Sequence, residues 1–313
     1  MAFGLFGLAD SSTVLVCCLS ANAMTQNTQC PVCGSCQRLT RRTPECIVSR
    51  CVKCSHEYTI ESEIFVPEVY KSDYYDITHK RWFDNPQYSL FRKILNGLLE
   101  VNPKLKDQDS SLRILDVGCG RCALLQYFAN FLPEAEFVGL DTSVGSVRPL
   151  NPRIALVDSV FKPSAVPGDF DVVISTAVIE HIADARGFLL DQLSLLKTID
   201  SSVLVVVTMD SNSPVYVLAR LLRSLGFSLA YNRLYSPHHV NHFSRESLLS
   251  LCHSLNLVQV KSDGINMELS ALDLPDSRIF PRRILEIITA LIFSFGAFIR
   301  RPFLQIHYFR ALA

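Results

Sequence analysis

Residues 113–125 read Arg-Ile-Leu-Asp-Val-Gly-Cys-Gly-Arg-Cys-Ala-Leu-Leu. The apolar start of this stretch leads into Asp116, then into the glycine pair Gly118 and Gly120, and then into a helical pattern of apolar residues. That order predicts a strand, a tight turn and a helix, because glycine allows a sharp turn and lets a nucleotide-like ligand lie close to the backbone. The start of the helix would present free N–H groups and its positive dipole end to such a ligand.

Three more apolar segments predict strands whose carboxyl ends meet at the same edge of a sheet. Residues 137–140 precede Asp141, residues 154–157 precede Asp158, and residues 170–176 follow. Asp141 comes about 20 residues after the glycine turn, where a doubly wound sheet places a carboxylate on ribose hydroxyls. Because strands alternate with helical segments, we expect a mainly parallel sheet, with later strands at 203–208, 257–261 and 303–309.

The ordered set of these motifs resembles class I S-adenosylmethionine-dependent methyltransferases, in the branch near the ubiquinone O-methyltransferases. The likeness covers residues 112–257 and is carried by Asp116-Val117-Gly118-Cys119-Gly120, Asp141, Asp158, Phe170-Asp171-Val172-Val173 and Glu180-His181. It implies an α/β fold: a Rossmann-like, mainly parallel seven-stranded sheet with helices on both faces.

The resemblance also implies a site for S-adenosylmethionine at the strand ends. Asp116 would hold the amino end of the cofactor, Asp141 the ribose hydroxyls and Asp158 the adenine amino group, since carboxylates accept hydrogen bonds from all three. The complete predicted set is Asp116, Gly118, Gly120, Asp141, Asp158 and Ser175. The alternative for each aspartate is an ordinary cap at a strand end, and Cys122 stands where the family has a small glycine.

Four cysteines near the N-terminus form two C-x2-C pairs, Cys30 with Cys33 and Cys51 with Cys54. Paired knuckles of this kind are typical of a structural zinc site, in which four thiolates leave no open position for catalysis. The alternative is a set of free buried cysteines. Thiolate ligands and a cofactor made in the cytosol both favour a reducing compartment, so we expect a cytoplasmic protein.

The chain divides into segments of different composition. Residues 1–23 are apolar but lack a positive n-region, so we expect a disordered extension, or a working start at Met24, rather than a signal peptide. Beyond them we expect a zinc-ribbon-like module at 24–60, a helical linker region at 61–110 and a methyltransferase domain at 111–313. Within that domain, residues 209–243 are predicted to cover the acceptor, and residues 284–299 form an apolar helix.

The composition describes a folded protein without a charge bias. Of its 313 residues 49% are hydrophobic, and 30 basic residues balance 30 acidic ones. Zero net charge and the absence of a basic, aromatic-interleaved strip argue against nucleic acid as a partner.

Methyl transfer to oxygen requires removal of a proton, and histidine is suited to that task near neutral pH. The candidates are His181, directly after the fourth strand, and His239 and His242 in the covering segment. The alternative for each is a structural histidine. A metal bound by these histidines is not expected, because no set of carboxylates lies nearby in the sequence.

The apolar segment 284–299 is shorter than the roughly 20 residues that span a bilayer, and it contains Glu286. One interpretation is a core or interface helix. The other is a helix lying in the headgroup region, with the arginine pairs at both ends touching anionic lipid, so that the protein is peripheral at the membrane. The second interpretation fits a lipid-linked acceptor.

These observations favour an S-adenosylmethionine-dependent methyltransferase that acts on a small molecule: a sugar, a quinone-like ring or a lipid-linked precursor. A second hypothesis is an RNA base methyltransferase, some of which also pair a zinc module with this fold. A third is a non-catalytic zinc-dependent scaffold with a degenerate cofactor fold. Cofactor titration separates the third from the others, and comparison of RNA with small acceptors separates the first two.

Overall fold

The computed structural model describes most of the chain, namely residues 14–16, 29–43, 46–61, 80–106, 112–197, 201–272 and 281–312. In the first 23 residues only the backbone of strand β1 (Val14–Val16) belongs to this set, so the prediction for that segment lies outside the described residues.

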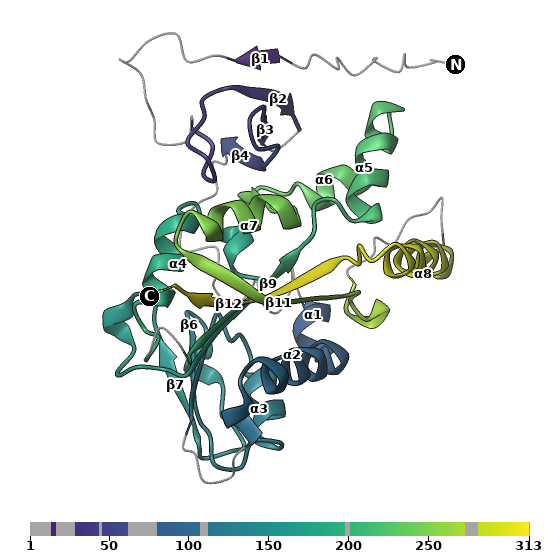
Figure 1. The fold of residues 1–313 in the computed structure, drawn as a ribbon. Coiled ribbons are helices and arrows are strands. Elements are labelled where there is room, and N and C mark those ends of the chain that lie inside the picture. Colours follow the sequence, from purple (N-terminus) through teal and green to yellow (C-terminus); the bar gives the residue numbers. More distant parts are fainter. Residues whose placement is uncertain are drawn as a thin grey trace.

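A seven-stranded sheet forms the centre of the larger domain (Figure 1). Its strand order is β11-β12-β9-β8-β5-β6-β7; β12 runs antiparallel to both of its neighbours, and β9 through β7 pair in parallel. The strands are Arg113–Val117 (β5), Glu136–Asp141 (β6), Ile154–Asp158 (β7), Val172–Thr176 (β8), Val203–Met209 (β9), Leu257–Ile265 (β11) and Leu304–Ala311 (β12). This sheet confirms the predicted Rossmann-like fold.

Helices cover both faces of the sheet, as predicted (Figure 1). One apolar cluster joins the sheet to α2, α3, α5, α6 and α8, and a second joins it to α4 and α7. The helices are Lys80–Asp84 (α1), Tyr88–Val101 (α2), Ala123–Ala129 (α3), Ala185–Leu193 (α4), Pro214–Ser224 (α5), Leu229–Leu234 (α6), Arg245–His253 (α7) and Arg282–Phe298 (α8). Short 3-10 helices are Pro103–Lys106 (η4), Val144–Ser146 (η5), Pro163–Ala165 (η6), Ile179–His181 (η7) and Leu269–Ala271 (η8).

The cysteine module forms part of a second sheet, whose last strand comes from the larger domain. The order is β1-β2-β3-β4-β10, with β2 at Arg38–Arg42, β3 at Ile47–Cys51, β4 at Glu57–Glu61 and β10 at Asn241–His242. Strand β10 lies between α6 and α7 in the chain and pairs antiparallel with β4. The module is therefore joined to the predicted acceptor-covering segment by main-chain hydrogen bonds.

A capping box sets the start of α7. The N–H of Ser247 donates to Oγ of Ser244 over 3.2 Å, and the N–H of Ser244 donates to Oγ of Ser247 over 3.0 Å. Reciprocal bonds of this kind satisfy two donors that a helix start would otherwise leave unpaired. Ser244 is thus the N-cap of α7.

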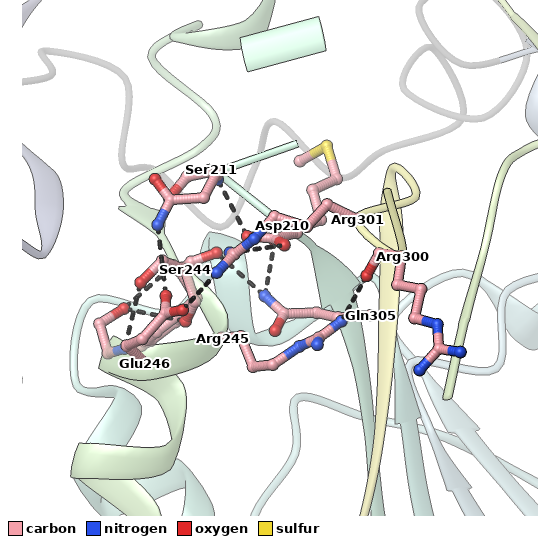
Figure 2. A network of polar contacts seen from close by, with 12 residues as sticks. Asp210, Ser211, Ser244, Arg245, Glu246, Arg300, Arg301 and Gln305 are labelled. Atoms are coloured by element: carbon pink, nitrogen blue, oxygen red, sulfur yellow. Dashed lines mark hydrogen bonds and ion pairs between the residues drawn. The ribbon is translucent and has the colours of Figure 1, made fainter. Parts of the chain in front are cut away.

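A polar network fixes the C-terminal end of α8 against the sheet (Figure 2). Arg301 donates to Glu246 over 2.8 Å and lies 3.7 Å from the buried carboxylate of Asp210, at the end of β9. Gln305 of β12 donates to the carbonyl oxygens of Met209 and Phe243, both over 3.0 Å. Because a buried carboxylate without a cation is strongly destabilising, Arg301 is a structural residue.

Candidate functional site

The turn after β5 has the backbone conformation that its glycines predict. Gly118 and Gly120 have φ angles of +76° and +52°, in the left-handed region that glycine tolerates. A Cβ atom at Gly118 would lie 2.4 Å from Cγ2 of Val178, and one at Gly120 would lie 2.7 Å from Cε1 of Phe83. Cys122 has a φ of +67° and therefore adopts a strained conformation in the place of a glycine.

Asp141, at the end of β6, faces this turn. Its Oδ2 accepts a hydrogen bond from the N–H of Gly120 over 3.0 Å, and its Oδ1 accepts one from the N–H of Ser143 over 3.1 Å. Asp141 also lines the cavity that opens at the turn. The carboxylate thus holds the turn in shape and is available to a ligand there.

Asp116 is buried beneath the turn, with an Oδ1 that has no hydrogen-bond partner among the described residues. Burial, together with the nearby charge of Asp141, raises the pKa of Asp116 to about 7. A buried carboxylate oxygen without a partner is costly unless a ligand or water satisfies it. The cationic amino end of S-adenosylmethionine, reached directly or through water, fits that requirement.

A cavity of about 930 Å³ extends from the turn toward the C-terminal helices, near the upper end of the usual range for small-molecule sites. Close to the turn it is lined by Gly118, Asp141 and Thr142, with Phe83 of α1 above. Its far part is lined by apolar side chains of α5, α6 and α8, including Val215, Leu218, Leu222, Leu229, Leu285 and Ile292. We call this far part the apolar chamber.

Of the six predicted cofactor residues, Gly118 and Asp141 line the cavity, whereas Asp116, Gly120, Asp158 and Ser175 do not. Asp158 is the register partner of Asp141 between β7 and β6, and its side chain is exposed. Ser175 is buried in β8, and its Oγ has no hydrogen-bond partner among the described residues. Contact of either residue with the cofactor stays a prediction.

His181 and His239 line the middle of the cavity, with ring centroids 4.9 Å apart. Nδ1 of His181 lies 2.8 Å from the carbonyl oxygen of His238, and Nδ1 of His239 lies 3.0 Å from that of Leu234. Because a carbonyl only accepts, each Nδ1 carries the proton, and Nε2 of the neutral ring is the acceptor nitrogen. Burial lowers the pKa of His239, which keeps that ring neutral at pH 7.

The third candidate, His242, lies behind the cavity rather than in its wall. It is buried, its ring lies 4.4 Å from that of Tyr235, and neither ring nitrogen has a hydrogen-bond partner among the described residues. Burial lowers the pKa of His242 well below its usual value, so the ring is neutral. This placement favours the structural alternative for His242.

Glu180 is a cavity residue that the sequence analysis did not place among the site residues. Its Oε2 accepts a hydrogen bond from Oγ1 of Thr208 over 2.8 Å, and burial raises the pKa of its carboxyl group to about 7. In the sequence, the only indication that Glu180 belongs to the site was its position next to His181. A carboxyl group with a pKa near neutrality can exchange a proton inside the cavity.

We expect Glu180 to make the folding stability depend on pH. Its folded-state pKa is raised from 4.5 to about 7, so the folded state favours the protonated form, and stability falls as pH rises from about 4.5 through 7. In the Glu180→Gln variant, the free energy of unfolding should fall by roughly 3 kcal/mol less over this pH range than in the wild type. Urea unfolding at pH 5 and pH 8.5 measures the effect, with the exposed Glu134→Gln as control. If the free energy of unfolding changed equally between the two pH values in the Glu180→Gln variant and the wild type, burial would not raise the pKa of Glu180.

The four predicted cysteines converge on one point. Sγ of Cys30 lies 3.5 Å from that of Cys54, Sγ of Cys33 lies 3.5 Å from that of Cys51, and all four sulfurs lie within 4.8 Å of one another. A tetrahedral zinc site with Zn–S bonds of about 2.3 Å requires sulfurs about 3.8 Å apart, so these residues fit the ion. Within the described part of the chain no other group of three or more His, Cys, Asp or Glu side chains could hold a metal ion.

Two aromatic residues that the sequence analysis left without a role, Trp82 and Phe83, also line the cavity. They belong to α1, whose Asp84 accepts a hydrogen bond from Arg121 of the glycine turn over 2.6 Å. This contact fixes α1 beside the glycine turn, where Phe83 lies against Gly120. The signal available in the sequence was a run of aromatic residues before α2, which does not specify a contact with a turn 35 residues later.

The family model of a methyltransferase domain matches residues 87–262, more than half of the chain. The chain belongs to this methyltransferase family. Its resemblance to class I S-adenosylmethionine-dependent methyltransferases is confirmed by that match, by the sheet order and by the curated relatives.

Two curated relatives are named ubiquinone biosynthesis O-methyltransferase. The one from Rickettsia bellii is 24% identical over 151 residues, which cover 45% of this chain and 62% of the relative. The one from Rhodopseudomonas palustris (strain HaA2) is 29% identical over 147 residues, covering 43% of this chain and 55% of the relative. The chain therefore spans less than two thirds of the length of these relatives.

Solved structures of methyltransferases are also similar to the chain. The plantazolicin methyltransferase BpumL in complex with SAH is 16% identical, has a TM-score of 0.49 and covers 78% of this chain and 92% of that one. A SAM-dependent methyltransferase from Archaeoglobus fulgidus is 19% identical, has a TM-score of 0.48 and covers 76% of this chain and 100% of that one.

Proposed function

We propose that the chain transfers the methyl group of S-adenosylmethionine to a hydroxyl group of an acceptor with a large apolar part. One observation carries the proposal: a single cavity runs from the glycine turn, past His181 and His239, into the apolar chamber. A cofactor at the turn and an acceptor in the chamber would meet at these histidines. The names of the curated relatives favour a quinone-like acceptor among the classes considered above.

Bound S-adenosylmethionine supplies a methyl group that is already activated on a sulfonium sulfur. The residues of the chain would align the acceptor oxygen with that group and remove its proton. We assign the proton to Nε2 of His181, because Nδ1 is held by the carbonyl of His238. The same loop carries Val178, whose side chain closes over Gly118, so His181 adjoins the cofactor end of the cavity.

We further propose that the acceptor enters from a membrane surface. Leu229 and Ile288 line the cavity although 61% and 42% of their surfaces are exposed, so the cavity opens beside them. Further exposed apolar side chains lie on α5, on the turn that follows it and on α8, and we call them the apolar face: Leu221, Leu225, Phe227, Ile287, Leu291, Phe295 and Phe298. A large exposed apolar area marks an interaction site. None of the helices in the described ranges is long and apolar enough to cross a bilayer, so α8 would lie within the headgroup region.

The arginines at the ends of α8 divide into two kinds. Arg282 pairs with Glu286 over 2.8 Å, and Arg301 belongs to the network with Glu246. Among the described residues, the guanidinium groups of Arg283 and Arg300 have no carboxylate partner. These two arginines are therefore available to anionic headgroups.

A labelled-methyl assay tests the activity. The protein is incubated with tritiated S-adenosylmethionine and, separately, with a lipid extract, a water-soluble metabolite fraction and RNA. We expect label in the lipid extract and millimolar or tighter binding of S-adenosylhomocysteine by calorimetry. Label in RNA alone would support the hypothesis of an RNA base methyltransferase. A protein that binds neither S-adenosylmethionine nor S-adenosylhomocysteine would support the hypothesis of a non-catalytic scaffold.

We expect Asp141→Ala to weaken S-adenosylhomocysteine binding by roughly 1–3 kcal/mol, about 5- to 150-fold. The carboxylate holds the N–H of Gly120, so its loss releases the turn as well as the predicted ribose contact. Calorimetry on the folded variant measures the change, with the exposed Asp169→Ala as control. Unchanged affinity would remove Asp141 from the cofactor site.

We expect the purified protein to carry about one zinc ion per chain, held by the two cysteine pairs. The variant Cys51→Ser, Cys54→Ser removes one ligand from each of the two closest sulfur pairs and should lose the metal. Metal analysis by mass spectrometry decides this, with the buried but separate Cys252→Ser as control. Full zinc retention in the double variant would show that other thiols bind the ion.

A further inference from the structure

The segment that carries His239 is held by the cysteine module. Strand β10 pairs with β4, with Asn241 opposite Tyr58 and His242 opposite Glu57. Directly before β10, the N–H of Thr59 donates to the carbonyl oxygen of Val240 over 3.0 Å. The hydroxyl of Thr59 donates to the carbonyl oxygen of His239, also over 3.0 Å.

A second connection runs from the knuckle to the loop of His181. His56, two residues after Cys54, is fully buried, and its Nε2 lies 3.0 Å from Oδ1 of Asn241. Nδ2 of Asn241 donates in turn to the carbonyl oxygen of Ile182 over 2.7 Å. The main-chain N–H of Val240 donates to the carbonyl oxygen of Glu180 over 2.8 Å. Strand β4 thus reaches both neighbours of His181 through residues 240 and 241.

A third connection joins the module to the covering helices. The carboxylate of Glu57 accepts hydrogen bonds from the hydroxyl of Tyr235, after α6, and from the guanidinium group of Arg220, in α5. Arg220 also donates to the carbonyl oxygen of Ser211 over 2.8 Å. Both members of the Glu57–Arg220 ion pair are largely buried, so the pair fixes the two helices that border the apolar chamber.

We propose that the four-cysteine module supports the wall of the acceptor site from outside the cavity, and that metal binding by its thiolates positions His181 and His239 through Thr59 and Asn241. This inference rests on the proposed function, since it assigns a task to the two histidines. A zinc ion closes the two knuckles that precede β4, and small zinc modules lose their structure without the ion. Thr59 and Asn241 are positioning residues: both touch the histidine segment, and neither lines the cavity.

The cofactor end of the cavity has different supports. The glycine turn is held by Asp141 of β6 and by Phe83 and Asp84 of α1, none of which belongs to the module or to the loop of His181. Loss of the metal should therefore displace His181 and His239, while the affinity for the cofactor is retained. That separation distinguishes a positioning module from one that stabilises the whole chain.

The test compares the zinc-loaded protein, the protein depleted by a chelator and the zinc-loaded variant Thr59→Val. This substitution removes the hydroxyl that bonds His239 and keeps the main-chain bond of residue 59. Thr43→Val is the matched control, because its hydroxyl bonds the carbonyl of Cys46 within the module. The readouts are zinc content, binding of S-adenosylhomocysteine by calorimetry, and ring resonances of ¹³C-labelled histidine assigned with His181→Asn and His239→Asn variants.

We expect depletion to shift the resonances of both histidines, and Thr59→Val to shift those of His239, while the affinity for S-adenosylhomocysteine changes by less than twofold. In the tritium assay kcat should fall about 10- to 100-fold, the usual cost of a misplaced catalytic group, and Thr43→Val should match the wild type. Unchanged histidine resonances after depletion would overturn the inference, and so would a tenfold loss of S-adenosylhomocysteine affinity. Failure of the wild type to bind S-adenosylhomocysteine would instead overturn the proposed function.

Discussion

We expect His181→Asn to lower kcat for methyl transfer by about 10²- to 10⁴-fold, the range that a positioned general base contributes. The asparagine side chain keeps an N–H donor near the place of Nδ1, where it can bond the carbonyl of His238, and it removes Nε2. The substitution therefore tests the base rather than the loop. Affinity for S-adenosylhomocysteine should change by less than twofold, because the glycine turn does not depend on this ring.

The pH dependence identifies the proton acceptor. A base acts in its deprotonated form, so kcat of the wild type should rise with pH below the pKa of the base and level off above it. This ascending limb should disappear in His181→Asn. His253→Asn, at the exposed end of α7, is the matched control and should keep both the rate and the profile. Loss of the limb in His239→Asn alone would transfer the assignment to His239.

The sheet and the cofactor turn could be predicted because their pattern is local. Seven apolar runs, a glycine pair and an aspartate at each early strand end follow one another in the order of the fold. Parallel strands bring such ends to one edge, so Asp141 and the turn were placed without a structure. The positive φ of Cys122 could not be predicted from its residue type, since residues with a Cβ atom rarely adopt this conformation.

The acceptor side of the site could not be predicted, because it depends on contacts between distant segments. Thr59 meets His239 across 180 residues, and Glu57 meets Tyr235 across 178. In the sequence, the strand-like pattern of the cysteine module ends near residue 60. No motif indicates that the segment of β10 pairs with this module. The short strand β10 has only two residues and no apolar pattern of its own.

Substitutions in the part of the apolar face that lies on α8 should have the second large effect. Leu291, Phe295 and Phe298 are 66%, 55% and 84% exposed, and none of them lines the cavity. Burial of one such side chain in an apolar phase contributes roughly 1.5–3 kcal/mol. Replacing all three by Gln should therefore weaken binding to phosphatidylcholine–phosphatidylglycerol vesicles by at least about 100-fold, with little change in the free energy of unfolding.

Vesicle flotation measures this binding, and the design uses the apolar side chains rather than the arginines because Arg301 is tied to the buried Asp210 (Figure 2). The control is Phe131→Gln with Leu150→Gln, two exposed apolar residues near α3 and β7, at the far end of the sheet from α8 (Figure 1). The control should float as the wild type does, and the triple variant should stay in solution while it still binds S-adenosylhomocysteine. A wild type that does not float at low salt, but elutes as a dimer that the triple variant loses, would assign the face to a second copy of the chain. Entry of the acceptor from a membrane would then be wrong, and a soluble acceptor in the apolar chamber would follow.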